Sequence, residues 1–413
     1  MKKALLVTTG YLPYTFSECL CNAKLVYALQ QNGWEVDVIS RIDDGLSYSQ
    51  DWTEPWLCLH QNTYEITYPL GTRISRCCDL LYSMVMMGYP LEGIRWARRA
   101  YQKAVELHKK KHYDVVLTRS PSDVPHIVGY KLKRHLGMRW IANWNDPSVT
   151  IWPEPYTHHF PTWKSKILNR YTIQCLKNAD VNTFPSQSLL DHFISHFSFL
   201  CNKFTKVIPH IALWESLYTP VKREKKDKFY MCHSGNLSSE RNPELLFQAM
   251  REMIDEGNIH MRLDIMGYIN DYTQELIEKY RLTDYVGCAG SYPYIEAMLK
   301  MQDYDVLVLL EARMEHGVFF ASKFTDYARV ARPIFAISPV NGFVKDMITK
   351  YGGGVVVDNE KYKDIKRGLS ELYYAWENDK LSDIYNLDQL YAQFSAKKIV
   401  RMYNDLDKSL PRL

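Results

Sequence analysis

A short glycine turn in the second half of the sequence contains residue types that bind anions. His233, Ser234, Gly235 and Asn236 follow an apolar segment that is predicted to form a strand, and Arg241 stands just before the next predicted helix. Glycine lets the backbone approach a phosphate, and N–H groups at a helix start attract negative charge. Arg241 could bind pyrophosphate oxygens in a bidentate manner. Any strand-to-helix turn can contain glycine, so an ordinary turn is the alternative interpretation.

A second cluster lies in residues 319–338, FFASKFTDYARVARPIFAIS. Ser322 is predicted to cap a helix whose first turn carries Lys323 and Asp326, which share one helix face because they are three residues apart. Ser322 and Lys323 could hold a phosphate, and Asp326 could accept hydrogen bonds from the two hydroxyls of a ribose. The alternative is a surface Asp–Lys pair on a capped helix.

The first half contributes two isolated candidates for acid–base chemistry. Asp146 follows the predicted strand RWIANW and could orient a substrate hydroxyl or accept its proton. The alternative for Asp146 is a simple Asp-Pro turn. His126 begins a predicted helix after another strand and is a second catalytic candidate, or else a packed or exposed histidine.

The predicted elements that carry these residues alternate between strands and helices. KKALLVTTG, CLCNAKLVYALQQNG and EVDVIS read as strand, helix and strand, and the same order restarts about 220 residues later at KFYMCHSGN. Such alternation indicates parallel sheets, and two restarts indicate two doubly wound α/β domains. Further strands are predicted at 113–119, 139–144, 206–213, 304–310, 333–338 and 354–358. We expect domains at 1–220 and 221–390, and a terminal helix in 391–413.

Taken together, these segments resemble the retaining glycosyltransferases of the GT-B fold, in the group-1 or family-4-type set that builds polysaccharides and glycolipids. Gly235-Asn236-Leu237 with Arg241 is similar to the family's Gly-Arg-Leu followed by Lys or Arg. SKFTDYARVARPIFAI is similar to a variant motif whose acidic residue binds the nucleotide ribose. WIANWNDPSVTIWP, KNADVNTFPSQSLLDHF and KVIPHI resemble N-terminal segments of the family, in the same order.

The resemblance implies two Rossmann-like domains facing a cleft, with a C-terminal helix that crosses back to the N-terminal domain. The C-terminal domain would bind a nucleotide-activated sugar of UDP or GDP type through Gly235, Asn236, Arg241, Ser322, Lys323 and Asp326. The N-terminal domain would bind the acceptor, a glycan or a lipid-linked glycan. No cofactor and no divalent metal are expected, because helix N-termini and basic side chains neutralise the leaving diphosphate.

The sequence departs from the family pattern at several acidic and basic positions. Asn236 stands where arginine is frequent, and Val318 aligns with the first acid of the family's E-x7-E element. Glu315 is the candidate to replace that acid, and we expect Glu315, Asp146 and His126 to be the catalytic residues. Asn143 and Asn145 replace the usual aspartate and arginine, which leaves Asp146 as the only acid of that motif.

Composition and charge narrow the location and the partners. Among the 413 residues, 46% are hydrophobic and 24% charged, which excludes a disordered or collagen-like chain. Nine cysteines without zinc-type spacing favour reduced thiols in the cytoplasm. Residues 73–139 contain 14 Lys and Arg against 5 Asp and Glu, next to the apolar segment LLYSMVMM. This stretch is either a solvated helix face or a peripheral contact with an anionic membrane at its inner face. No nucleic-acid-binding signature is present.

Two other functions fit the same fold. A nucleotide-sugar epimerase would need a set of catalytic acids and a histidine, of which the sequence shows only Asp146, Glu315 and scattered histidines. A non-catalytic partner subunit would tolerate the lost acids at Val318 and Asn143. Nucleotide binding that depends on Asp326 would favour the enzyme.

Overall fold

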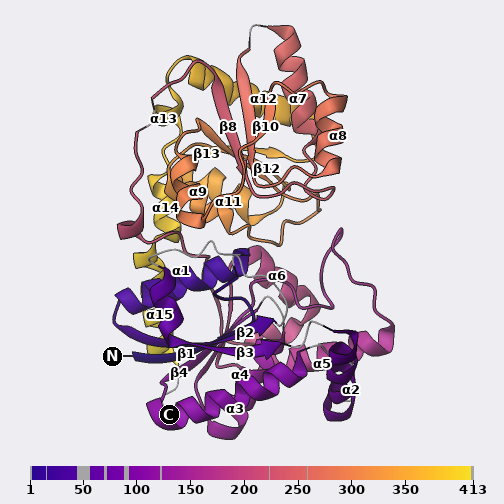
Figure 1. Ribbon diagram of the computed structural model, residues 1–413, viewed down its shortest axis with the longest axis vertical. Coiled ribbons are helices and arrows are strands. Elements are labelled where there is room, and N and C mark those ends of the chain that lie inside the picture. The colour runs from indigo at the N-terminus through magenta and orange to yellow at the C-terminus, as the bar shows by residue number, and fades with distance from the viewer. Residues whose placement is uncertain are drawn as a thin grey trace. The chain divides into compact units, whose positions relative to one another are not determined.

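The computed structural model describes residues 2–14, 16–43, 56–68, 72–87, 93–120, 123–222, 224–257 and 259–410. The chain divides into two compact units, one formed by residues up to Pro209 together with the chain from Ile399 onward, and one running from His210 to Lys398. The division between the units thus falls after Pro209, whereas the sequence predicted it after residue 220. Figure 1 shows the elements of each unit.

The first unit is built on a parallel seven-stranded sheet in the order β3-β2-β1-β4-β5-β6-β7. Its strands are β1 Lys2–Thr8, β2 Trp34–Asp43, β3 Thr63–Tyr68, β4 Val115–Arg119, β5 Trp140–Asn143, β6 Val181–Phe184 and β7 Thr205–Val207. Its helices are α1 Ser17–Gln31, α2 Arg73–Met87, α3 Ile94–Lys111, α4 Val124–Leu136, α5 Thr162–Asn178, α6 Gln187–His196 and the larger part of α15 Ala396–Ser409. The strand predicted at 206–213 ends early, because Pro209 has no N–H to donate to a neighbouring strand.

The second unit is built on a parallel six-stranded sheet in the order β10-β9-β8-β11-β12-β13. Its strands are β8 Phe229–Ser234, β9 Met261–Met266, β10 Val286–Cys288, β11 Val306–Leu310, β12 Ile334–Ser338 and β13 Gly354–Asp358. Its helices are α7 Glu244–Glu256, α8 Asp271–Lys279, α9 Tyr294–Met301, α10 Lys323–Val330, α11 Phe343–Tyr351, α12 Tyr362–Glu377, α13 Leu381–Ile384 and α14 Asp388–Phe394.

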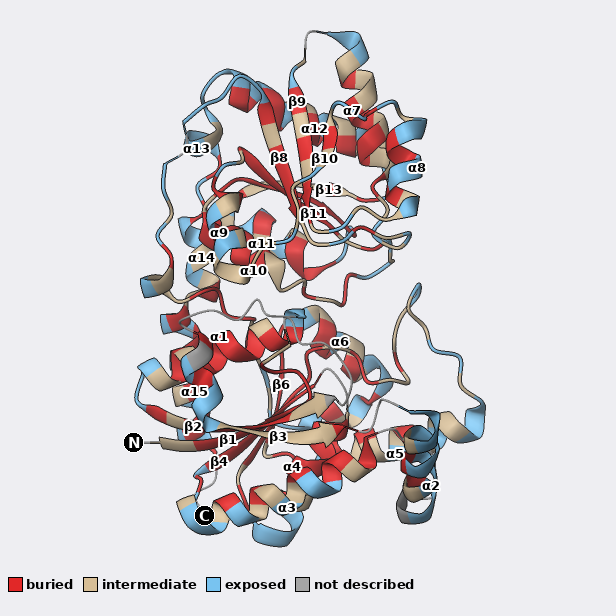
Figure 2. Ribbon diagram, viewed as in Figure 1, coloured by how far each residue is buried: buried red, intermediate tan, exposed pale blue. Residues whose placement is uncertain are grey.

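Both sheets have the buried, continuously apolar central strands that parallel sheets require. β11 reads VLVLL and every residue is buried, since helices cover both faces of the sheet. Figure 2 shows buried strands inside each unit and helices whose outer faces are exposed. The structure therefore confirms the predicted pair of doubly wound α/β units, with all carboxyl strand ends of a sheet on one edge. Ligands of such sheets bind at that edge.

Candidate active site

The turn after β8 brings a backbone amide and a cation together at the carboxyl edge of the second sheet. Gly235 has φ +111°, a conformation that side chains disfavour, and its N–H donates to the carbonyl of Met266 at 2.8 Å. A Cβ atom on Gly235 would lie 2.6 Å from the Lys323 Nζ. Glycine is therefore required here so that the Lys323 ammonium can reach the end of β8.

Lys323 and Arg241 are two neighbouring cations near the turn after β8. The Lys323 Nζ donates to the carbonyl of Ser234 at 2.5 Å. Loss of water around the ammonium group, and then the nearby charge of Arg241, lower the pKa of Lys323 to about 7. The Arg241 side chain is exposed. In the part of the chain that the structure describes, no carboxylate lies within ion-pair distance of either cation. An anionic ligand would supply the missing charge.

Asp326 lies on the first turn of α10 with Lys323, as its spacing predicts. Its side chain is buried, and its Oδ1 accepts a hydrogen bond from the Tyr294 hydroxyl of α9 at 2.6 Å. A carboxylate oriented by a tyrosine is suited to accept hydrogen bonds from hydroxyl groups of a ligand. The structure thus places Asp326, Lys323 and Gly235 at one edge of the sheet.

Two other residues that the sequence predicted to bind the donor, Ser322 and Asn236, have a different local geometry or a contact within the protein. Ser322 does not cap α10: its own backbone is helical and its side chain accepts no hydrogen bond from the helix. The Thr325 hydroxyl closes that turn by donating to the Ser322 carbonyl at 2.8 Å. The Asn236 Oδ1 accepts the Tyr268 N–H at 3.0 Å, so this side chain ties two loops together.

The loop between β11 and α10 contains Val318, which aligns with the first acid of the family's E-x7-E element, and Glu315, the candidate to replace that acid. The Glu315 side chain is 91% exposed, with His316 as a loose partner at 3.7 Å. Val318 is buried, and Gly317 donates to the Asn341 carbonyl at 2.6 Å, which fixes this loop. Glu315 therefore points to solvent, and the structure gives no support for the bend that would bring it to the strand ends.

Glu311 is a functional candidate that the sequence reading missed. It follows the last residue of β11 directly, and its carboxylate accepts a hydrogen bond from the Ser338 hydroxyl at 2.6 Å. Burial raises the pKa of Glu311 to about 7, against the Ser338 hydrogen bond and the charge of Arg241, which both lower it. Its position directly after an apolar strand was the available signal, since such residues lie at the ligand edge of a parallel sheet.

Two acidic side chains, Asp146 and Glu18, lie at the carboxyl edge of the first sheet. Asp146 lies three residues after β5, and burial raises its pKa to about 6. Glu18, in the first turn of α1, accepts a hydrogen bond from the Asn145 Nδ2 at 2.5 Å. Burial raises the pKa of Glu18 to about 8; the charge of Arg119 lowers it, and that of Asp146 raises it further. The sequence reading did not include Glu18.

Arg119 connects the elements around this edge. Its Nε donates to the Asn22 side chain of α1, and its Nη1 donates to the Tyr403 hydroxyl of α15 at 3.2 Å. The Glu18 carboxylate is 3.8 Å from the Arg119 Nε, longer than a hydrogen bond. The Arg119 guanidinium thus donates mainly to neutral partners. Its positive charge only partly offsets the negative charge of an ionised Glu18.

His126 is in the core rather than at this edge. Its side chain is fully buried, its Nδ1 is 2.8 Å from the Thr118 hydroxyl, and its ring packs on Trp144 with centroids 4.0 Å apart. Burial lowers the pKa of His126 to about 3, so the ring is neutral. The structure thus adds no support for a catalytic role of His126, and packing in the core accounts for the position of its ring.

The network at Glu18 predicts a pH-dependent stability. Because the pKa of Glu18 is higher in the folded chain than in the unfolded one, its contribution to stability falls as the pH rises from about 4.5 to 8. Glu18→Gln should remove this loss and unfold at higher urea than the wild type at pH 8, by roughly 2 kcal/mol, with little difference at pH 5. Urea unfolding followed by fluorescence measures it. The exposed Glu275→Gln is the control; a wild-type-like Glu18→Gln at pH 8 contradicts the assignment.

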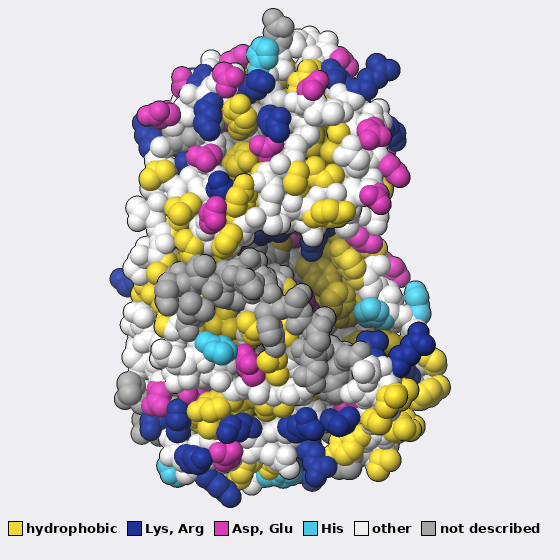
Figure 3. Space-filling view, viewed as in Figure 1, with side chains coloured by type: hydrophobic (Ala, Val, Ile, Leu, Met, Phe, Trp, Pro, Cys, Tyr) yellow, Lys and Arg dark blue, Asp and Glu magenta, His cyan; other side chains and the backbone are white. Residues whose placement is uncertain are grey.

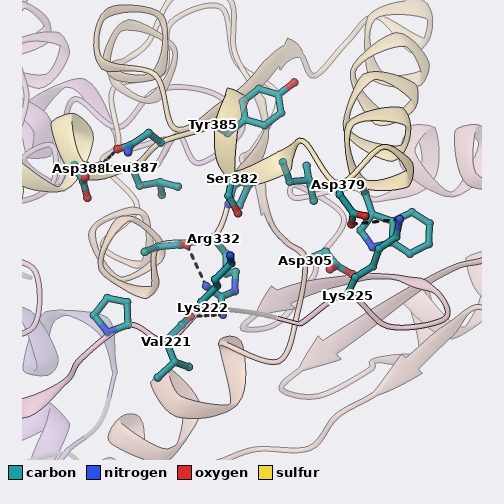
Figure 4. Close-up of a pocket in the computed structure, with 16 residues that line it drawn as sticks. Val221, Lys222, Lys225, Asp305, Arg332, Asp379, Ser382, Tyr385, Leu387 and Asp388 are labelled. Atoms are coloured by element: carbon teal, nitrogen blue, oxygen red, sulfur yellow. Dashed lines mark hydrogen bonds and ion pairs between the residues drawn. The ribbon is translucent and has the colours of Figure 1, made fainter.

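The pocket in Figure 4 lies at the opposite edge of the second sheet. Asp305 and Pro333, which line it, directly precede β11 and β12, so the pocket is at the amino ends of the strands. Its volume is about 490 Å³. Two of its cations already have partners in the protein: Lys225 pairs with Asp379 at 3.4 Å, and Arg332 donates to the Val221 carbonyl at 2.9 Å. The candidate residues at the carboxyl edge are separate from it.

The described residues contain neither a metal-type cluster of side chains nor a helix that could span a membrane. No group of three or more His, Cys, Asp or Glu side chains is arranged to hold a metal ion in the described ranges. Within the same ranges, no helix has the length and hydrophobicity to cross a membrane.

Solved structures share this architecture over nearly the whole chain. Sucrose-phosphate synthase from Thermosynechococcus elongatus matches with a TM-score of 0.70 at 14% identity, covering 99% of this chain and 98% of that one. Anabaena HepE in complex with UDP matches with a TM-score of 0.65 at 13% identity, covering 99% and 100%. The catalytic domain of starch synthase IV from Arabidopsis thaliana, bound to ADP and acarbose, matches with a TM-score of 0.64 at 10% identity, covering 98% and 99%. At such identities the likeness establishes the fold.

The sequence itself adds a family assignment for the second unit. Residues 217–383 match the family described as glycosyl transferases group 1, a range that includes Gly235, Lys323 and Asp326. No curated protein matches the chain. The chain therefore has the two-domain GT-B fold of these structures, and its residues 217–383 form a glycosyl transferases group 1 domain.

Proposed function

We propose that this chain transfers a sugar from a nucleoside-diphosphate sugar to a glycan or a lipid-linked glycan, with retention at the anomeric carbon and without a divalent metal. The observation that carries the proposal is the pair of cations at the end of β8, Lys323 and Arg241, which have no described carboxylate partner. A diphosphate would neutralise both. The UDP complex of the structurally similar HepE supports a donor of UDP or GDP type.

The donor would lie along the carboxyl edge of the second sheet. Lys323, Arg241 and the N–H groups near Gly235 would hold the diphosphate, and Asp326 would accept hydrogen bonds from the ribose hydroxyls. Glu311, at the end of β11, is near enough to Arg241 for the arginine charge to lower its pKa, and it would contact the transferred sugar or the phosphate. As the bond to the sugar breaks, the fixed cations would stabilise the charge that develops on the leaving phosphate.

The acceptor would bind at the carboxyl edge of the first sheet. Asp146 and Glu18 are two acids of different protonation state there, so one could accept and the other donate a hydrogen bond to an acceptor hydroxyl. The leaving phosphate would take the proton of the attacking hydroxyl on the same face of the sugar, and the protein would supply positioning. We further propose a cytoplasmic enzyme that is peripheral at the inner face of an anionic membrane.

A thermal shift followed by a donor panel tests this proposal. UDP or GDP at one hundred times its dissociation constant should stabilise the second unit by about 2.7 kcal/mol. One sugar of a panel of UDP- and GDP-sugars should then be hydrolysed slowly or transferred, and the product's anomeric configuration read by NMR. Stabilisation that persists in full in Asp326→Ala, or release of an inverted product, would contradict the proposed site or the proposed stereochemistry, respectively.

A further inference from the structure

Helix α2 has its polarity reversed relative to an ordinary surface helix. Ile74, Leu81 and Val85 are 77%, 65% and 84% exposed, whereas Asp79 and Ser83 are fully buried. The three apolar residues are spaced by seven and four positions, so they form one stripe along the helix. Cys77, Cys78, Leu80 and Met84 are exposed as well. A surface helix normally buries such a stripe and exposes its aspartate.

Polar contacts with α3 hold α2 in this orientation. The buried Asp79 carboxylate accepts the N–H of Gly93 at 2.7 Å and that of Arg95 at 3.3 Å, at the start of α3. Arg98 donates to the Tyr82 hydroxyl at 2.7 Å, and its guanidinium lies 5.7 Å from the centre of the Tyr82 ring. Turning the apolar stripe inward would break these contacts and leave an aspartate at the surface. The outward stripe is thus a built feature of this unit.

The cations around the stripe indicate what it contacts. Arg73 and Arg76 on α2 and Arg98 and Arg99 on α3 are exposed. Across the described residues of α2 and the first two turns of α3, Asp79 is the only acid, and it is buried. Figure 3 shows the hydrophobic side chains over α2 at the lower right, with Lys and Arg beside them. Apolar side chains rimmed by cations complement a surface with an apolar interior and anionic head groups.

We propose that the outer face of α2 docks on an anionic lipid bilayer, with Ile74, Leu81 and Val85 among the acyl chains and the four arginines at the phosphates. This extends the peripheral location in the proposed function and names the element responsible. Two lysines at the end of α3 contribute less, because they already have acidic partners: Lys111 pairs with Asp37 at 2.7 Å and Lys110 with Glu106 at 2.8 Å. Each arginine near an anionic surface is worth about fivefold in partitioning, and the gain decays within a Debye length.

Co-sedimentation of the full chain with vesicles tests the proposal. The wild type should bind vesicles of phosphatidylcholine with phosphatidylglycerol, not pure phosphatidylcholine, and high salt should release it. Leu81→Gln with Val85→Gln should weaken binding about tenfold or more. The matched control replaces Leu299 and Ile384, which are 53% and 55% exposed in the second unit, and should bind like the wild type. Charge reversal of Arg73 and Arg99 should also abolish binding, whereas reversal of Lys109 and Lys397 should not.

Several results would overturn the proposal. The wild type could remain in the supernatant with anionic vesicles, or the α2 variants could bind as well as the wild type. Light scattering could instead show a dimer that the α2 variants lose, which would assign the stripe to a second copy of the chain. Because the α2 substitutions are on the surface, their UDP or GDP thermal shift should equal that of the wild type. Failure of membrane binding with an intact shift would therefore leave the proposed transferase reaction standing.

Discussion

Replacing Lys323 with methionine should lower kcat/KM by a factor of about 100 to 1,000. The ammonium group is fixed 2.5 Å from the Ser234 carbonyl at the end of β8, where the leaving diphosphate of the donor would lie. Removing one preorganised donor to a developing negative charge typically costs about 2.7–4 kcal/mol. Steady-state kinetics with the best donor measures the effect. Lys363→Met, a change at an exposed lysine of α12, should leave the rate unchanged. Activity within twofold of the wild type in Lys323→Met would remove this residue from the site.

The lowered pKa of Lys323 gives this site a pH dependence. With a pKa of about 7, part of the lysine is neutral in the free enzyme at neutral pH, and binding of an anion should draw in a proton. Donor affinity should be constant well below pH 7 and weaken by up to about tenfold per pH unit above it. Calorimetry at pH 7.5 in two buffers of different ionisation enthalpy should show proton uptake. Glu311 titrates in the same range, so uptake that survives in Lys323→Met would assign the proton to Glu311.

Replacing Asp326 with alanine should weaken nucleotide binding by about 1.5–3 kcal/mol, the range for hydrogen bonds to a charged group. That corresponds to roughly a 10- to 150-fold change in the dissociation constant. The carboxylate is buried beside Tyr294. We therefore attribute the expected loss of affinity to hydrogen bonds with the ribose hydroxyls rather than to the attraction of a solvent-exposed charge. Calorimetry with UDP or GDP measures it.

Tyr294→Phe is an informative companion to Asp326→Ala. It keeps the ring and the carboxylate but removes the 2.6 Å hydrogen bond that orients Asp326. We expect a smaller loss of affinity than in Asp326→Ala. A 2′-deoxynucleotide should bind the wild type more weakly and discriminate less in Asp326→Ala. Equal loss for both nucleotides in the variant would show that Asp326 does not contact the ribose.

The sequence predicted the elements and the short-range part of the candidate site. Lys323 and Asp326 are three residues apart on one helix, so local periodicity was enough to pair them, whereas the family resemblance linked this pair with Gly235. The Ser322 cap failed because Ser322 itself adopts helical backbone angles and Thr325 closes the turn. The position of Glu315 could not be predicted, because the conformation of its loop, with the contact of Gly317 to Asn341, is not encoded in periodicity; its catalytic role stays a prediction.

Local periodicity could not predict the contacts, at the carboxyl edges of the sheets, between residues that are far apart in the sequence. Glu18 and Asn145 are separated by 127 positions and meet only because β1, β4 and β5 are neighbours in the sheet order. The sequence did not predict the reversed polarity of α2, for a related reason. Its apolar stripe has the spacing of a buried face, and the contacts of Asp79 and Tyr82 with α3 hold that face outward.

The discontinuous composition of the first unit has a consequence for how the chain folds during synthesis. α15 contributes Tyr403 to Arg119, Asn404 to the Trp34 indole at 3.0 Å, and Asp407 to Lys2 at 2.7 Å. These contacts join α15 to β1, β2 and β4, which are all synthesised before the second unit. We therefore expect the first unit to complete its packing, including the contact of Arg119 with Tyr403, only after the whole second unit has been translated. A nascent chain arrested before residue 399 should hold a folded second unit and a first unit that is still readily digested by protease.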